Sequence, residues 1–398
     1  HHTSRDQRLL PYHEELKKAG ACFGQSGEYE RPMWYALDGA TPKYQYSFNK
    51  QNWYPSVEFE CKNTCENVGL FELSPFSKYE IKGIKAHKEL QRLCTANIKN
   101  EVGKCTYTHM LNEAGGVETD LTIVCIDKNH FRIISSAAVR THDKAHILKH
   151  ISPDIEFKDV TDDFACLGLF GPKSRDLITK LTNSDFSNDK FKFGTSKNIK
   201  INDKIVWAQR LSYVGELGYE LYIKTNEARE IYNLIIEIGK EFKLSHCGAH
   251  SMDTMRMESG FLHWGHDISP EENQYQAGLN FAISYKKNIN FIGKKAVEKI
   301  KLQKLDRRFV MFILKNNEPG IPLLLHEEPI YLDDKIIGKT TSGNYSFNFN
   351  KNLTFGYIKT DLSNEELANK KLFVEVEKQR HPMAIQLKPL KQTDFKNL

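Results

Sequence analysis

The feature that most constrains the fold is a change in sequence texture close to residue 295. Before it, strand-like and helix-like segments are interleaved without the regular alternation of a doubly wound sheet. After the basic segment KKAVEKIKLQK, short strand-like runs such as RRFVMFILK and KLFVEVEK are separated by Gly, Pro, Asp and Asn. We therefore expect an α+β region over residues 1–295 and an all-β domain, a barrel or a sandwich, over residues 296–398.

Within the first region, hydrophobic periods and end signals predict individual elements. AHKELQRLCTANI predicts a helix over residues 86–98, and a second helix is expected over about 137–151. IVWAQRLSY and GYELYIK predict two strands, of which the first ends at Tyr213. Asn226 is placed to cap the amphipathic helix that follows, and SMDTMRMES predicts a helix ending at Gly260.

Composition excludes several classes of protein. The 398 residues carry a formal charge of +5, and 11% of them are aromatic, which is core-forming material and argues against disorder. No apolar run approaches the roughly 20 residues that a bilayer span requires, and no basic patch is interleaved with aromatics. We therefore expect neither a membrane nor a nucleic acid as partner. The eight cysteines are scattered through apolar segments, which favours a reducing compartment over a disulfide frame.

Several common motifs are absent from the sequence. It contains no GxGxxG after a strand, no P-loop, no HExxH and no GxSxG. The chain is therefore not expected to bind FAD or NAD in the Rossmann manner. Cys61 and Cys65 have the spacing of half a metal site, but no second pair follows, so we predict no metal centre.

The segment LNEAGGVETDLTIV contains the first candidate site. Gly115 and Gly116 allow a sharp turn or a close approach to a ligand. Asp120 follows at the start of a strand, with Thr122 on the same face by the period of two. On pattern alone, a solvated Asp that closes a turn is the favoured interpretation.

The segment SYVGELGYELY contains the second candidate site. Glu220 and Tyr222 share one face of a strand, opposite Tyr219 and Leu221, and Tyr213 ends the preceding strand. The polar face of an ordinary hairpin explains this pattern equally well.

A third segment, FLHWGHDISPEENQYQAGLNFAIS, predicts a long ordered loop because it is rich in Gly, Pro and aromatic residues. His263 and His266 have a spacing that metal ligands use, but no third ligand lies nearby. A structural role is the favoured interpretation.

Taken together, these segments resemble the aminomethyltransferase (glycine cleavage T-protein) superfamily of folate enzymes. More specifically, they resemble the C-terminal, folate-binding half of dimethylglycine dehydrogenase, sarcosine dehydrogenase and dimethylglycine oxidase. The likeness runs in order over nearly the whole chain, through GACFGQSGEYERPMWY, GLFELSPFSKYEIKG, LNEAGGVETDLTIV, SYVGELGYELY, MDTMRMESGFLHWGHDI, QAGLNFAISYKKNINFIGKKA and TTSGNYSFNFNKNLTFGYI. The resemblance implies two interleaved α/β lobes followed by a C-terminal β-barrel.

The resemblance also implies roles for individual residues. Asp120 matches the family's catalytic aspartate, which acts beside the nitrogens of tetrahydrofolate. Tyr213 matches the tyrosine that packs on the folate, and Glu220 matches the glutamate that binds the amino-pyrimidine edge of the pterin. The remaining matches to folate-contacting positions are Leu121, Thr122, Leu221, Tyr222 and Phe281, the last lying where relatives often carry Tyr.

One departure bears on the donor. T-proteins of glycine cleavage usually carry Arg immediately before the aspartate that reads here as Asp253, whereas this chain has Met252. Together with HWGHD, this favours the dehydrogenase and oxidase group. That group has an N-terminal FAD half, so FAD is expected only in a missing half or a partner. Because the chain begins at His1, it is expected to be either the C-terminal portion of a longer protein or a stand-alone demethylase.

The leading hypothesis is the capture of a methylene group from an oxidised N-methyl amine of the dimethylglycine or sarcosine type. Tetrahydrofolate would accept it as 5,10-methylenetetrahydrofolate. One alternative is a stand-alone demethylase that moves a methyl group from a sulfonium or ammonium compound to tetrahydrofolate. Another is a folate-binding assembly factor without turnover. The expected compartment is the cytoplasm, or the mitochondrial matrix of a eukaryote.

Overall fold

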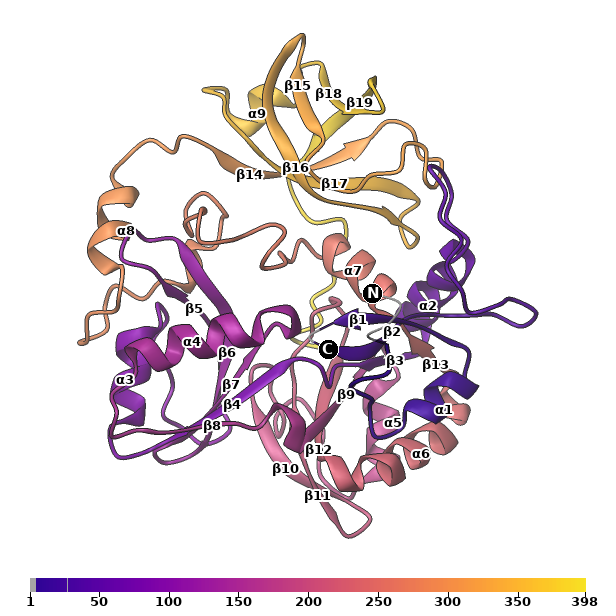
Figure 1. The fold of residues 1–398 in the computed structure, drawn as a ribbon, viewed down its shortest axis with the longest axis vertical. Helices are drawn as coiled ribbons and strands as arrows, with labels where there is room; N and C mark the ends of the chain where they lie inside the picture. The colour runs from indigo at the N-terminus through magenta and orange to yellow at the C-terminus, as the bar shows by residue number, and fades with distance from the viewer. Residues whose placement is uncertain (1–4, 27) are drawn as a thin grey trace.

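The α+β region is built from two sheets whose strands interleave along the chain (Figure 1). The computed structural model describes residues 5–26 and 28–398, so His1 and His2 lie outside it. The first sheet has the order β10-β11-β12-β9-β3-β13, and its strands are β3 Val68–Glu72, β9 Phe164–Phe170, β10 Ser196–Ile201, β11 Lys204–Gln209, β12 Gly218–Lys224 and β13 Leu244–Cys247. Pairing is antiparallel throughout this sheet except between β13 and β3.

The second sheet is inserted between β3 and β9 of the first. It has the order β5-β6-β7-β4-β8, from β4 Ser77–Lys82, β5 Cys105–Leu111, β6 Val117–Asp127, β7 His130–Ser135 and β8 Glu156–Asp159. A two-stranded ribbon of β1 Ala21–Ser26 and β2 Tyr29–Tyr35 completes the region. This arrangement confirms the prediction of an α+β fold with two interleaved lobes.

Helices cover one face of each sheet and part of the other face of the first sheet. Their bounds are α1 His13–Lys18, α2 Tyr54–Glu66, α3 Ala86–Leu93, α4 Arg140–His150, α5 Ser174–Leu181, α6 Ala228–Gly239, α7 Ala249–Glu258, α8 Lys294–Lys301 and α9 Asn364–Leu367. On the first sheet, Leu177 of α5 and Ile231 of α6 pack against Tyr219 and Leu221. Burial of one such aliphatic side chain contributes about 1.5–3 kcal/mol.

The other faces of the two sheets share one apolar cluster, to which α2 and α7 also contribute. Val124 of β6 belongs to the same buried cluster as Trp207 of β11 and Tyr222 of β12. The opposite face of the second sheet, with Ile123 and Ile133, is covered by α3 and α4. Because strand faces alternate with a period of two, residues 120, 122 and 124 of β6 look toward the interior that residues 220 and 222 of β12 also face.

The C-terminal strands form a closed six-stranded barrel, as expected, at the top of Figure 1. Its order is β14-β17-β16-β15-β18-β19, from β14 Arg308–Leu314, β15 Pro329–Leu332, β16 Lys335–Ser346, β17 Lys351–Ile358, β18 Leu372–Val376 and β19 Gln379–Gln386. The last residues leave the barrel and return to the first lobe, where the Leu398 carbonyl accepts from Arg175 and Arg210 (2.6 Å each). The domain boundary at residue 295 lies within α8 and stays a prediction.

Three local predictions about the elements were wrong. The helix expected over 86–98 ends at Leu93, because Cys94 already has extended backbone. Asn226 does not cap α6, because residues 225–227 form a 3₁₀ turn and the helix begins at Ala228 without a side-chain cap. Strand β11 ends at Gln209, so Tyr213 lies in the connection to β12 and not at a strand end.

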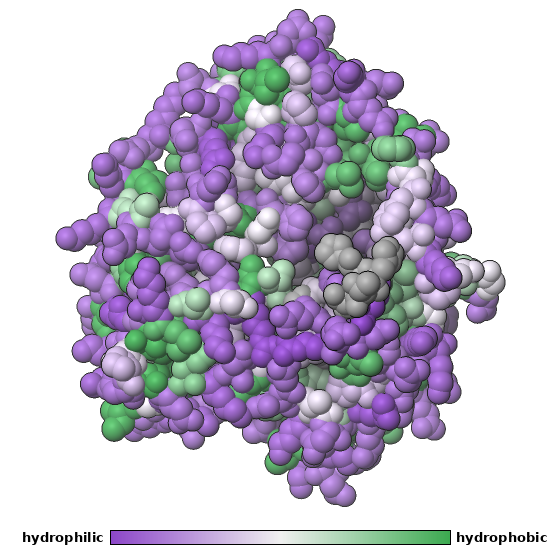
Figure 2. Space-filling view, viewed as in Figure 1, coloured by the Kyte–Doolittle hydropathy of each residue, from purple (hydrophilic) through white to green (hydrophobic). Residues whose placement is uncertain are grey.

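The surface in Figure 2 is largely hydrophilic, with apolar residues in small separate patches. Among residues 5–26 and 28–398, no helix is long and apolar enough to cross a membrane.

Candidate active site

Asp120 lies in the middle of β6, directly across from His109 of β5. Its side chain is 16% exposed, and His109 Nε2 is 3.9 Å from Asp120 Oδ1. Gly116, just before β6, lies against another segment of the chain. A Cβ at this position would be 1.9 Å from the Pro270 carbonyl oxygen. The glycine therefore accommodates a close pass of the chain's own 269–274 loop.

A chain of hydrogen bonds holds His109 behind the carboxylate. Gln274 Nε2 lies 2.8 Å from His109 Nδ1, and His109 Nε2 lies 3.1 Å from the Tyr107 hydroxyl. An amide nitrogen only donates, so Nδ1 is the acceptor and the ring proton is assigned to Nε2. Tyr107 in turn donates to Asp120. The carboxylate thus has neutral donors beside it and no cationic partner.

The electrostatics of this group follow from burial. Removal from water raises the pKa of Asp120 to about 7, and the nearby Asp143 carboxylate adds to the rise, while the Tyr107 hydrogen bond opposes it. Burial also lowers the pKa of His109 to about 3, so its ring is neutral at pH 7. A carboxyl group that titrates near neutrality is suited to accept a proton and return it.

A second carboxylate, that of the half-buried Glu220, lies on β12. The Tyr222 hydroxyl donates to Glu220 Oε2 (2.9 Å), and Gln209 Nε2 donates to the same oxygen (3.2 Å). Burial raises the pKa of Glu220, and both hydrogen bonds oppose the rise. The acceptor Oε1 of Gln209 is buried without a partner. Carboxylate and amide oxygens here offer acceptors to a flat ligand with a donor-rich edge.

Tyr213 packs against the apolar cluster that the two sheets share. Its hydroxyl donates to the Leu262 carbonyl (2.9 Å), and its ring stacks on Phe261 with centroids 6.1 Å apart. Burial raises the pKa of the Tyr213 hydroxyl, and the charges of Arg256 and Asp120 also act on it. Since its hydroxyl is engaged, Tyr213 presents an aromatic face and no free polar group.

The other predicted residues differ in what their side chains reach. Thr122 is half-buried on the Asp120 face of β6, and Tyr222 is buried beside Glu220. Leu121 and Leu221 point the other way, into the helix-covered cores of their lobes, so only their backbone faces the interior.

Phe281 is 72% exposed, and its ring stacks on Tyr107 at 6.2 Å. It thus forms an outer wall next to the Asp120 group.

The sequence matches two family models over most of its length. Residues 12–287 match the GCVT N-terminal domain, and residues 307–391 match the glycine cleavage T-protein C-terminal barrel domain. The chain belongs to the glycine cleavage T-protein family. Its members bind tetrahydrofolate.

Among its relatives, this T-protein family member is 35% identical to 4-methylaminobutanoate oxidase (formaldehyde-forming) of Paenarthrobacter nicotinovorans, over 90% of the chain and 43% of that protein. It is 34% identical to mitochondrial dimethylglycine dehydrogenase of Rattus norvegicus, over 96% of the chain and 44% of that protein. The chain therefore spans less than half the length of these two curated relatives.

The fold comparison covers the complete chain of a T-protein. The crystal structure of the glycine cleavage system aminomethyltransferase T from Bartonella henselae superimposes with a TM-score of 0.82, at 20% identity, over 97% of this chain and 98% of that one. At this identity the match shows the fold, which confirms the architecture inferred from the resemblance.

Several residues of the site were not predicted from the sequence. Tyr107, His109 and Gln274 surround Asp120, and Gln209 holds Glu220. The alternation on β5 could have suggested Tyr107 and His109 as a pair on one face. Their position opposite Asp120 depends on strand register, which the sequence does not state.

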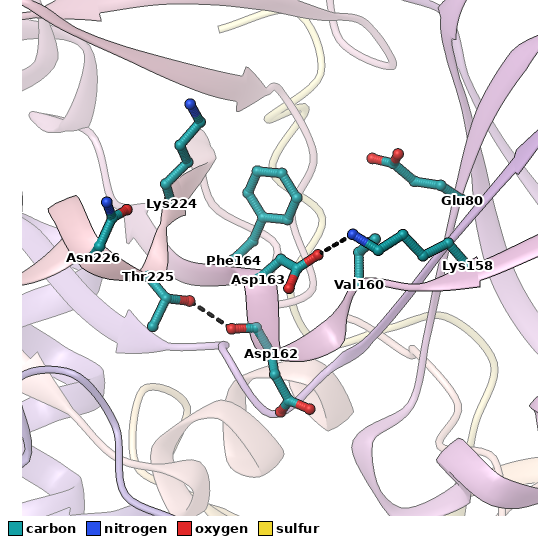
Figure 3. Close-up of a pocket in the computed structure, with 9 residues that line it drawn as sticks. All are labelled: Glu80, Lys158, Val160, Asp162, Asp163, Phe164, Lys224, Thr225 and Asn226. Carbon is teal, nitrogen blue, oxygen red and sulfur yellow. Dashed lines mark hydrogen bonds and ion pairs between the residues drawn. The ribbon is translucent and has the colours of Figure 1, made fainter.

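An open cavity of about 550 Å³ lies elsewhere, at the edge shared by the two lobes (Figure 3). Its lining has mixed charge, with Lys158 paired to Asp163 at 2.8 Å. None of the predicted site residues lines it. Arg132 connects the cavity with the site, because its guanidinium lies over the Phe164 ring of the cavity wall (4.4 Å) and over the Tyr222 ring (5.9 Å).

The two loop histidines do not form a metal site. The rings of His263 and His266 lie 4.7 Å apart, and the backbone N–H of His263 donates to Asp267. Within the described part of the chain, no three His, Cys, Asp or Glu side chains gather as metal ligands would.

Proposed function

We propose that this chain is a tetrahydrofolate-dependent one-carbon transferase that captures the methylene group of an oxidised N-methyl amine, of the dimethylglycine or sarcosine type. The product is 5,10-methylenetetrahydrofolate. The observation that carries the proposal is Asp120, a carboxyl group only 16% exposed and with a pKa of about 7, facing the interior that also contains Glu220.

The residues fit a reduced pterin. The half-buried Glu220 carboxylate lies next to the buried Gln209 Oε1, which has no partner among the described residues, and this pair of acceptors suits the amino-pyrimidine edge. Tyr213 supplies an aromatic face, and Thr122 lies beside Asp120 on the opposite lobe. Tetrahydrofolate, when bound, supplies the nucleophilic nitrogens that take the carbon.

The chain's own contribution to the reaction is proton handling and exclusion of water. Transfer of a methylene group from an iminium ion to two N–H nitrogens frees two protons, and the departing amine gains two. Asp120 accepts a proton from the folate side and returns it to the amine. Neutral His109 and Tyr107 keep the carboxylate oriented without lowering its pKa as a cation would.

An FAD-dependent oxidoreductase supplies the oxidised amine in this proposal. The relatives named above are an oxidase and a dehydrogenase by name, and each extends over more than twice the length matched here. The flavin unit is either fused to this chain or a separate partner. In this proposal, the flavin unit and this chain both determine which amine serves as the donor.

The test supplies the chain with tetrahydrofolate, dimethylglycine and a flavin dehydrogenase that oxidises dimethylglycine. We expect formaldehyde release to fall and 5,10-methylenetetrahydrofolate to appear in equal amount when the chain is added. Unchanged formaldehyde release would refute the proposal. Formation of 5-methyltetrahydrofolate from a sulfonium or ammonium donor, without a flavin unit, would instead support the demethylase alternative.

A further inference from the structure

Arg31 of β2 differs from the other buried arginines. Four arginines in the described part of the chain are at least nine-tenths buried: Arg31, Arg132, Arg210 and Arg256. Three of them donate to oxygen: Arg132 to Glu80, Arg256 to Asp253 and Asp267, and Arg210 to Asn188 and backbone carbonyls. Arg31 is 9% exposed and makes no such bond within residues 5–26 and 28–398.

The contacts of Arg31 leave the Nε–Nη2 edge of its guanidinium without an oxygen acceptor among the described residues. Nε is buried with no partner, and Nη2 lies 3.9 Å from the sulfur of Met252, a weak acceptor. The guanidinium also lies over the Phe76 ring at 5.6 Å. Nε and Nη2 present two parallel N–H groups, which is the geometry that a carboxylate accepts in bidentate fashion. In this chain, Arg132 uses the same two nitrogens on Glu80.

Nearby carboxylates do not neutralise Arg31. Glu72 and Asp253 act on it electrostatically, but neither lies within ion-pair distance. Asp253 pairs with Arg256 (2.8 Å), and Glu72 Oε1 accepts from Tyr12 (2.8 Å). A buried guanidinium without a counter-charge is costly unless a ligand supplies one.

The position of Arg31 connects it to the proposed active site. Tyr213 is among the groups that act electrostatically on the guanidinium, and Tyr213 in turn is acted on by Asp120. Met252, which Arg31 contacts, belongs to the apolar cluster against which Tyr213 also packs, so Arg31 borders the interior that Asp120 faces. A small amino acid could extend its nitrogen toward Asp120 and its carboxylate toward Arg31.

We propose that Arg31 binds a carboxylate in this site, and that the carboxylate belongs to the amino acid that carries the transferred carbon. The inference rests on the proposed function, since it names the substrate class as N-methyl amino acids rather than simple amines. The glutamate tail of folate is the other source of a carboxylate, and the experiment distinguishes the two.

The experiment measures binding by calorimetry for wild type, Arg31→Gln and Arg31→Lys. Sarcosine and the uncharged-end analogue sarcosinamide are titrated in the presence of 5-formyltetrahydrofolate. We expect wild type to prefer sarcosine by about tenfold or more. Arg31→Gln should abolish this preference without changing sarcosinamide affinity, and Arg31→Lys should keep part of it. Arg380→Gln, an exposed barrel arginine paired with Asp334, is the control.

A second titration identifies the source of the carboxylate. It compares 5-formyltetrahydrofolate with 6-methyltetrahydropterin, which lacks the glutamate. If Arg31→Gln weakens only the folate, Arg31 binds the folate tail and the assignment to the amino acid is overturned.

If no affinity changes while the variant melts at a different temperature, Arg31 is a structural residue and the carboxylate site is refuted. Should Arg31→Gln fail to fold, the wild-type preference for sarcosine over sarcosinamide and the Arg31→Lys variant decide the question.

If wild type fails to bind 5-formyltetrahydrofolate, the proposed function falls. The comparison of sarcosine with sarcosinamide in the absence of folate then decides whether Arg31 is a carboxylate site.

Discussion

The two lobes each place a carboxylate in the middle of a strand, on the face that looks into the shared interior. Asp120 on β6 and Glu220 on β12 are both removed from water, and burial raises the pKa of both. They differ in how they are held. Glu220 accepts two hydrogen bonds on one oxygen, from Tyr222 and Gln209, whereas Asp120 has Tyr107 beside it and His109 Nε2 only at 3.9 Å.

This difference separates binding from proton transfer. A carboxylate fixed by donors holds a constant position and suits recognition of a ligand edge. A carboxylate with a pKa near 7 and few donors changes its protonation state easily and suits general acid–base work. The same residue class on the same kind of strand thus acquires two roles from its neighbours, and the following predictions test that separation.

Asp120→Asn should have the largest effect. The amide cannot accept a proton, so formation of 5,10-methylenetetrahydrofolate should fall by about 10²–10⁴-fold. Binding of 5-formyltetrahydrofolate, measured by fluorescence quenching, should stay within about twofold because the binding carboxylate is elsewhere. Asp127→Asn, at the exposed end of the same strand, is the control. Wild-type turnover in Asp120→Asn would remove Asp120 from the mechanism.

Glu220→Gln should show the reverse pattern. Loss of the charged acceptor should weaken 5-formyltetrahydrofolate binding by about 10–100-fold, while turnover at saturating folate changes less. Calorimetric titration measures the affinity, and Glu230→Gln on the exposed side of α6 is the control. Unchanged affinity would mean that β12 does not carry the pterin site.

The pH profile should report Asp120 directly. Because the base works when deprotonated and its pKa is about 7, kcat/KM should fall about tenfold for each pH unit below that value. Initial rates measured between pH 5.5 and 8.5, at intervals of about 0.5 pH unit, would define this acidic limb of the kcat/KM profile. The remaining activity of Asp120→Asn should not show this decline at acidic pH. A decline that persists in this variant would have to come from another ionisable group.

The same shift predicts an effect on stability. The folded chain holds the Asp120 proton more tightly than the unfolded chain, so its favourable contribution is present at low pH. It is lost as the pH rises from the ordinary aspartate pKa of 3.8 through about 7. Asp120→Asn should therefore raise the melting temperature at pH 8 by a few degrees, at roughly 2–4 °C per kcal/mol. No gain is expected near pH 4, and equal gains at both values would point to a cause other than ionisation.

Phe281→Ala should have the smallest effect. The ring is 72% exposed and stacks on Tyr107 at the outer edge of the site. We expect a change in folate affinity of less than about threefold. A loss similar to that of Glu220→Gln would show that the outer wall closes over the ligand when it binds.

The sequence predicted the face on which each site residue lies, because strand alternation is a local property. Asp120 with Thr122, and Glu220 with Tyr222, share faces as their spacing indicates. The prediction of a cap at Asn226 was wrong because a 3₁₀ turn competes with the helix for the same residues. Such short-range alternatives differ by little free energy, and packing decides between them.

Local patterning by itself determined the α+β region, the all-β character of the C-terminal domain and the two carboxylate strands, since periodicity and turn residues act over a few positions. Only the tertiary structure decided that the two strand faces meet in one interior, that His109 lies behind Asp120, and that Arg31 is buried without an oxygen partner. Register, burial and charge pairing are sums over residues far apart in the chain. A window of sequence contains the side chains but not the neighbours that set their pKa values and their partners.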